Sequence, residues 1–294
     1  MNVLLRLGRT VPLALFLCLG GCTSGVLDPK GPIGRAEQVI LFDATVIMLA
    51  VVLPVILSTV IFAWWFRVGN ARARRLPNWS YSGRIEFVVW SIPALVVLFL
   101  GGVAWIGSHD LDPKASLQVA APPITVEVIS LDWKWLFIYP DQRIATVNRL
   151  VIPAGVPVRF RLTSAGVMNS FFVPQLGSQI YTMAGMATQL NLQADSPGNF
   201  RGLSAQFSGD GFSDMQFEVA ALTPQGFDDW IAQVRAHGDL LDPAQYAQLI
   251  RQSHRDAPRT FGAVSAGLFE AIVANPGAAL PIAQAGRSLP AIAH

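Results

Sequence analysis

The chain has 294 residues, of which 52% are apolar and only 14% are charged. Soluble domains carry roughly 25% charged residues, so this balance indicates a membrane protein. The formal net charge is +2, and we expect no nucleic-acid partner.

Residues 1–21 are typical of a secretory signal peptide. Two arginines precede the apolar core VPLALFLCL, and the following LGGC, which ends at Cys22, resembles the bacterial lipoprotein box. This motif predicts cleavage before Cys22, a lipid such as palmitate on its thiol, and a periplasmic tether over residues 22–38. The alternative is a buried cysteine in an uncleaved helix. The polar stretch TSGVLDPKGPIG favours the lipoprotein.

The sequence contains two cysteines, Cys18 and Cys22. The first would leave with the signal peptide and the second would carry the lipid. The mature chain would then have neither a free thiol nor a disulfide, which excludes chemistry that needs a thiolate.

Two uncharged stretches, Ala44–Phe66 and Phe87–Ser108, are each long enough to cross a bilayer. They predict transmembrane helices over residues 39–67 and 85–108. The loop between them, residues 68–84, is rich in arginine and contains no acid. Because short basic loops stay in the cytoplasm, we expect both ends of the mature chain in the periplasm of a bacterial inner membrane.

Glu86 stands at the start of the second predicted span. An acid in the first turn of a helix is stabilised by the helix dipole, by about 0.3–1 kcal/mol. A carboxylate at a membrane boundary can also mark a proton route. The residue's position alone leaves both interpretations open.

Residues 109–222 contain short apolar or alternating runs that are broken by Pro, Gly, Asp and Ser, which predicts an antiparallel β-sandwich. Short helices are expected over residues 223–258, because Thr223 and Asp242 each precede a proline as a capping residue. The Ala/Pro-rich residues 259–294 are expected to be poorly ordered. An apolar stripe on the first short helix is expected to pack against the sandwich: Phe227, Trp230, Ile231 and Val234.

The stretch RGLSAQFSGDGFSDM, residues 201–215, has the spacing of a copper-binding loop without its ligands. A shared two-copper site needs bridging thiolates, imidazoles and a weak thioether. Serines replace the two thiolates here, and hydroxyls are poor ligands for soft copper. The positions at which copper ligands would have been lost are Asn169, Ser204, Gln206, Ser208, Phe212 and Met215.

A weaker alternative is a Cu(I) site built from the thioethers of Met168, Met183, Met186 and Met215. Methionines in a sandwich more often fill gaps in the core. The four histidines lie outside both predicted spans, so the chain cannot hold a membrane haem between histidines. The sequence also lacks G-x-S-x-G, H-E-x-x-H and P-loop motifs, so we expect no catalytic residue and no metal in this chain.

The two spans, the basic loop and the copper-shaped loop resemble subunit II of the haem–copper terminal oxidases. The strings SLDWKWLFIYPDQRIATVN, VMNSFFVPQLGSQIYTMAGM and GFSDM resemble the cytochrome bo-type ubiquinol oxidase branch. This resemblance covers the chain from Cys22 to about residue 255. It implies a membrane-anchored α+β chain with a transmembrane helix hairpin and a periplasmic cupredoxin-like Greek-key β-sandwich that lacks the copper centre.

The resemblance also implies a function. The complex would oxidise quinol, reduce oxygen to water and translocate protons, with haem and copper in subunit I and no cofactor in this chain. The partners would be subunit I, further small membrane subunits and the lipid bilayer. Glu86 would lie at the cytoplasmic mouth of a proton channel in subunit I. A period-two aromatic run would serve as core and as contact with subunit I: Trp133, Trp135, Phe137 and Tyr139.

Two other functions remain as alternatives. A copper-containing cytochrome c oxidase subunit II would require ligands that the sequence lacks. A membrane-tethered periplasmic binding or sensor domain would work without an oxidase partner, although a lone tether needs only one span or a lipid.

Overall fold

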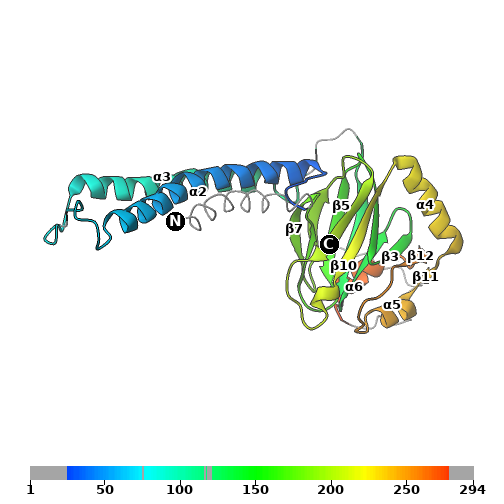
Figure 1. Cartoon of the computed structure of the whole chain (residues 1–294). Helices are drawn as coiled ribbons and strands as arrows, with labels where there is room; N and C mark the ends of the chain where they lie inside the picture. The colour runs from blue at the N-terminus through cyan, green and yellow to red at the C-terminus, as the bar shows by residue number, and fades with distance from the viewer. Residues whose placement is uncertain (1–24, 75, 116, 118–120, 278–294) are drawn as a thin grey trace, which may run out of the picture. The chain divides into compact units, whose positions relative to one another are not determined.

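The computed structural model describes residues 25–74, 76–115, 117 and 121–277 (Figure 1). The predicted signal peptide, Cys22 and residues 278–294 lie outside this part of the chain. Two compact units are present. One covers residues 36–112, and the other combines the residues before them with those from Pro113 onward.

The first unit is a helix hairpin made by α2 (Pro32–Trp65), from Ala36 onward, and α3 (Gly83–Asp110). Both helices are long and apolar enough to cross a membrane, and their apolar windows are not buried inside the protein. The helices approach closely at Gly107, where an added Cβ would lie 2.7 Å from Cδ1 of Ile40. Small residues commonly allow such contacts between membrane helices. The hairpin agrees with the predicted spans: α3 extends beyond both ends of its span, whereas α2 begins earlier than predicted and ends at Trp65, before the predicted end.

The predicted tether was given too late an end, at residue 38, because α2 already begins at Pro32. The helix α2 begins at Pro32, and proline suits the first turn of a helix because its missing N–H needs no partner there. Residues 25–35 belong to the second unit. The backbone N–H of Lys30 donates to the carbonyl of Gln175 at 2.6 Å, and that of Gly34 to Leu176 at 3.1 Å.

The second unit is a β-sandwich of two sheets (Figure 1). The seven-stranded sheet has the order β11 (Asp239–Leu241), β12 (Arg259–Val264), β3 (Ile144–Val147), β2 (Lys134–Tyr139), β1 (Ile124–Leu131), β5 (Val158–Ser164) and β8 (Thr188–Leu192). The five-stranded sheet has the order β4 (Arg149–Pro153), β10 (Gln216–Leu222), β9 (Gly198–Ser204), β6 (Asn169–Val173) and β7 (Gly177–Thr182).

The sandwich is mixed, so the prediction of a purely antiparallel one was wrong. The pairs β1–β5, β4–β10 and β11–β12 are parallel. Between β1 and β5 the chain forms two strands of the same sheet and then β4 of the opposite sheet. It therefore returns to β1 in the same direction, and this crossing between sheets cannot be read from the alternation of single strands.

The main core lies between the two sheets and contains the predicted aromatic run. Trp135, Phe137 and Tyr139 alternate along β2 toward this core, and Trp133 in the preceding turn joins the same cluster. The hydroxyl of Tyr139 donates to the carbonyl of Val151 at 2.9 Å, which satisfies its polar end. Burial of one such aromatic side chain stabilises the fold by about 1.5–3 kcal/mol.

The predicted helices after the sandwich are α4 (Pro224–His237) and α5 (Pro243–Leu249). Each is capped as expected, because Thr223 accepts from the N–H of Gly226 and Asp242 from that of Gln245. The expected stripe on α4 packs against the main core through Phe227, Trp230, Ile231 and Val234.

The expectation of poor order was wrong for residues 259–274. They form β12, which is a strand of the seven-stranded sheet, and α6 (Leu268–Ala274), which helps to cover the outer face of that sheet. Leu136 and Ile138 of β2 point to this face and belong to a second apolar cluster with Phe261, Phe269 and Ile272. Both faces of β2 are therefore apolar, and the second face requires the C-terminal segment as its cover.

Candidate functional site

The loop with copper-like spacing connects β9 to β10 and contains the short 3₁₀ helix η2 (Phe212–Asp214). It lies beside the first residue of β6, Asn169. The hydroxyl of Ser204 donates to Oδ1 of Asn169 at 3.1 Å, and the N–H of Ser204 donates to the carbonyl of Met215 at 2.9 Å. The hydroxyl of Ser208 lies 3.7 Å from Sδ of Met215. Four of the six predicted positions therefore meet at one place.

The other two positions contribute differently. Gln206 offers its backbone carbonyl, which accepts from the hydroxyl of Ser204 at 3.3 Å. The ring of Phe212 packs on that of Phe207, with 5.7 Å between their centroids. The ring of Phe212 thus has a neighbour in its own loop.

Hydrogen bonds hold the meeting point together. Asn169 and Ser204 are buried, with 2% and 3% of their surfaces exposed. The side-chain amide of Asn169 donates to the carbonyl of Val167 at 3.2 Å, and the backbone carbonyl of Asn169 accepts from the hydroxyl of Thr182 at 3.3 Å. Each such bond contributes about 0.5–1.5 kcal/mol, and a buried group left without a partner would cost more.

This donor set does not fit a two-copper centre. Hydroxyl and amide oxygens are hard ligands, whereas shared copper requires bridging thiolates and imidazoles. The one soft atom at the meeting point is Sδ of Met215. Met215 is buried, whereas Met168 and Met186 are 40% and 53% exposed, so this arrangement does not support a Cu(I) site shared among the methionines either. Among the described residues, no three His, Cys, Asp or Glu side chains are grouped as metal ligands would be.

Trp133 lies against the loop from the turn between β1 and β2. A Cβ added to Gly211 would lie 2.0 Å from Cδ2 of this indole, so the close approach of loop and ring requires glycine. The backbone of Trp133 has φ 63°, a conformation that costs energy for an aromatic residue. The imidazole of His254 stacks on the same indole, with 4.7 Å between the ring centroids.

His254 belongs to residues 251–259, which we call the C-terminal strap. The strap reaches the loop through Asp214 of η2, whose carboxylate lies 3.2 Å from Nδ1 of His254 and 3.4 Å from Nε of Arg255. These contacts hold the loop from outside the sandwich.

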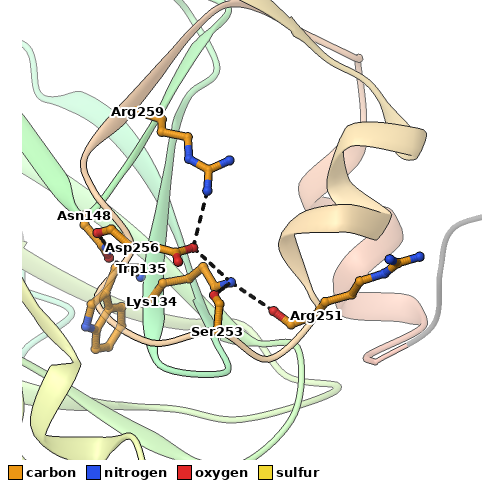
Figure 2. Close-up of polar contacts among 7 residues, drawn as sticks. All are labelled: Lys134, Trp135, Asn148, Arg251, Ser253, Asp256 and Arg259. Carbon is orange, nitrogen blue, oxygen red and sulfur yellow. Dashed lines mark hydrogen bonds and ion pairs between the residues drawn. The ribbon is translucent and has the colours of Figure 1, made fainter.

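A buried lysine ties the strap to β2 (Figure 2). Nζ of Lys134 lies 3.2 Å from the carboxylate of Asp256, donates to the carbonyl of Arg251 at 3.0 Å and also donates to the hydroxyl of Ser253. Only 2% of the Lys134 side chain is exposed. The amide of Asn148 donates to the backbone carbonyl of Asp256 at 2.9 Å.

Sequence reasoning missed Lys134 and Asp256. The available signal was a single lysine inside the apolar run WKWLFIY, because a buried lysine needs an acidic partner. That partner lies more than a hundred residues away, and nothing in the sequence identifies it.

The surface around the loop is unusually apolar. Residues 121–277 contain six exposed large apolar side chains. Five of them, which we call the apolar rim, lie in or beside the β5–β6, β7–β8 and β9–β10 loops: Val167, Met168, Tyr181, Met186 and Phe207. Backbone contacts join these segments, since Tyr181 pairs with Ser170 and the N–H of Ala205 donates to the carbonyl of Ser170. Exposed apolar groups gathered in this way mark an interaction surface.

Glu86 lies exposed in the first turn of α3. Its backbone N–H donates to the carbonyl of Ser82 at 3.0 Å, which closes the first turn. Ser82 makes no side-chain cap, and Glu86 is the acid of this first turn, where the helix dipole favours negative charge.

Two family matches fall on the β-sandwich unit. Residues 140–222 match the family described as cytochrome C oxidase subunit II, periplasmic domain. Residues 235–275, which contain the strap, match the family described as COX aromatic rich motif. The fold and the loop thus define a membrane-anchored protein with an oxidase subunit II periplasmic domain.

Relatives that match most of this chain identify the family more closely. The chain is 48% identical to cytochrome bo(3) ubiquinol oxidase subunit 2 of Pseudomonas aeruginosa, over 89% of this chain and 79% of the relative. It is 46% identical to ubiquinol oxidase subunit 2 of Acetobacter aceti, over 93% and 90%. It is 39% identical to quinol oxidase subunit 2 of Bacillus cereus, over 84% and 86%. The chain therefore belongs to the family of quinol oxidase subunit 2.

Proposed function

We propose that this chain is the non-redox subunit II of a respiratory quinol oxidase, an enzyme that couples quinol oxidation to the reduction of oxygen to water. The relatives named as quinol or ubiquinol oxidase subunits support this activity for the complex. The chain would have no catalytic residue of its own. Its role would be structural, as the periplasmic cover of subunit I.

The observation that carries this proposal is the hydrogen-bonded closure of the loop. The side chains of Ser204 and Asn169 form hydrogen bonds with each other and with nearby backbone carbonyls. A copper-bearing relative needs metal ligands at these positions. Cytochrome c delivers electrons one at a time from the aqueous side and therefore needs a relay there. Quinol is soluble in lipid and can deliver electrons inside the membrane, directly to a haem of subunit I. A chain without ligands at the loop suits the second route.

The partner surface for subunit I would be the apolar rim. It surrounds the loop that an electron-relaying relative would turn toward its haem-bearing subunit, and it is the main exposed apolar surface of residues 121–277. Haem and copper would reside in subunit I, and further small membrane subunits would complete the complex.

The orientation would place the loop between α2 and α3 in the cytoplasm of a bacterial inner membrane, because that loop carries the arginines. The β-sandwich and a lipidated Cys22 would then face the periplasm. Glu86, in the first turn of α3, would lie at the cytoplasmic side, where a carboxylate can feed protons into subunit I.

A tag on this chain tests the proposal. The complex extracted in mild detergent should contain haem and consume oxygen with quinol, and it should not consume oxygen with reduced cytochrome c. A chain that purifies alone and without haem would contradict the proposal and favour a tethered binding or sensor domain.

A further inference from the structure

Four exposed arginines gather at one end of the helix hairpin. Arg67, Arg72, Arg74 and Arg84 lie on the segment that joins the last residue of α2 to the first turn of α3. We call residues 67–74 and 76–84 the arginine loop. The sequence has no Asp or Glu between Ala44 and Ile85, so the loop has no acid of its own to neutralise these charges.

Aromatic side chains precede the arginine loop at the end of α2 and lie within it near the start of α3. Trp64, Trp65, Trp79 and Tyr81 are all exposed, between 42% and 69%. Exposed Trp and Tyr at the ends of apolar helices lie at the depth of the lipid headgroups. The loop between them therefore lies at the level of the lipid phosphates.

Local contacts hold the start of the arginine loop against the end of α2. The guanidinium of Arg67 lies 4.9 Å from the ring centroid of Trp64 and donates to its carbonyl at 2.9 Å. The side-chain amide of Asn70 donates to the carbonyl of Trp65 at 2.6 Å, and its oxygen accepts from the N–H of Arg72 at 3.2 Å. The turn is thus built on the helix end: Arg67 lies against Trp64, and Arg72 and Arg74 follow within the next seven residues as exposed side chains.

We propose that the arginine loop is a binding site for the phosphate of an anionic phospholipid headgroup. A guanidinium presents paired N–H donors that match two phosphate oxygens, which makes arginine better suited than lysine to this contact. The aromatic side chains place the site at the membrane surface, where the acyl chains of the same lipid can lie along α2 and α3. The inference does not depend on the quinol oxidase activity.

The positive charge also has a simpler explanation, since basic loops set the orientation of membrane helices. That role needs charge during insertion and predicts no preference among lipids afterwards. A second explanation is a contact with an acidic surface of a partner subunit. Each of these two explanations predicts an outcome that differs from that of a lipid site. One set of measurements therefore separates the lipid site, the role in insertion and the contact with a partner subunit.

The test uses the full chain in its purified complex, in a detergent without charge. Binding of dioctanoyl-phosphatidylglycerol is measured by native mass spectrometry and by titration, with dioctanoyl-phosphatidylcholine and inorganic phosphate as comparison probes. Each basic residue near an anionic surface contributes about a fivefold gain in affinity. The double variant Arg72→Gln/Arg74→Gln should therefore bind the anionic lipid about 25-fold more weakly, and 1 M salt should weaken the wild type similarly.

Matched variants make the result specific. Arg149→Gln/Arg201→Gln removes two exposed arginines from the sandwich and should leave lipid binding unchanged. Arg72→Lys/Arg74→Lys retains the charge for insertion and should lose only part of the affinity. Equal binding of the two lipids, or an unchanged double glutamine variant, would overturn the proposal. So would inorganic phosphate binding as tightly as the lipid, or loss of a partner subunit from the variant with its lipid binding intact.

Discussion

The ion pair between Lys134 and Asp256 predicts that removal of the carboxylate destabilises the fold more than removal of the ammonium does. Lys134 is 2% exposed and Asp256 is 12% exposed, and the carboxylate keeps a second cation, Arg259, at 3.7 Å. Removal of the Asp256 carboxylate leaves the buried ammonium of Lys134 without a counter-charge. Removal of the ammonium leaves a carboxylate that still has Arg259 and some water.

Asp256→Asn should therefore lower the free energy of unfolding by about 3–5 kcal/mol, as is typical when one partner of a buried pair is lost. Lys134→Met retains the packing of the aliphatic stem and should cost about 1–3 kcal/mol, mostly from the lost hydrogen bonds to the strap. For a domain of this size, about 1 kcal/mol corresponds to a shift of about 2–4 °C in the unfolding midpoint. The two variants should thus be separable by several degrees.

The assay is thermal unfolding of the full chain in detergent micelles, followed by tryptophan fluorescence, with limited proteolysis of the strap as a second readout. Asp239→Asn changes an exposed acid of β11 and serves as the control, with an expected change within about 0.5 kcal/mol. A larger loss from Lys134→Met than from Asp256→Asn would refute the reasoning from burial. Stability of Asp256→Asn within about 1 kcal/mol of the wild type would refute the role of the strap.

Three further predictions concern the loop, the membrane boundary and the outer face of β1. Ser204→Cys, Ser208→Cys and Asn169→His together should create a copper-binding loop, because Ser204 already contacts Asn169 and Ser208 already contacts Met215. Copper binding is detected by absorbance after copper addition, and failure to bind copper would count against the loop alignment. Glu86→Ala should lower the oxygen-uptake rate of the assembled complex if the carboxylate feeds protons, and unchanged turnover would leave only its dipole role. Burial raises the pKa of the Glu127 carboxyl in the folded chain, chiefly by desolvation. The wild type should therefore lose stability relative to Glu127→Gln as the pH rises from about 4 through that raised pKa, with a constant difference above it; midpoints measured from pH 4 to 8 that differ by the same amount throughout would exclude this effect.

The elements that sequence reasoning predicted are those with a local cause. The spans follow from uncharged length, and the capped starts of α4 and α5 follow from Thr223 and Asp242 with the prolines after them. The meeting of Asn169 with Ser204 was also predictable, although only through the spacing of a copper loop.

What could not be predicted depends on contacts between distant parts of the chain. The strand β12 pairs with β3 across more than a hundred residues, and its sequence RTFGAV does not alternate regularly between polar and apolar residues. A signal for α6 was present in Leu268, Phe269 and Ile272, whose spacing fits one face of a helix. The Ala/Pro-rich composition of the residues that follow obscured it.

The central claim is that electrons reach the oxidase without passing through this chain. The most direct measurement mixes the oxidised, tag-purified complex rapidly with quinol or with reduced cytochrome c and follows haem reduction, with electron paramagnetic resonance spectra of the same sample. The account predicts haem reduction by quinol alone and no signal from a shared two-copper centre. Haem reduction by cytochrome c, or a two-copper signal that disappears in a Met215→Ala variant, would contradict it.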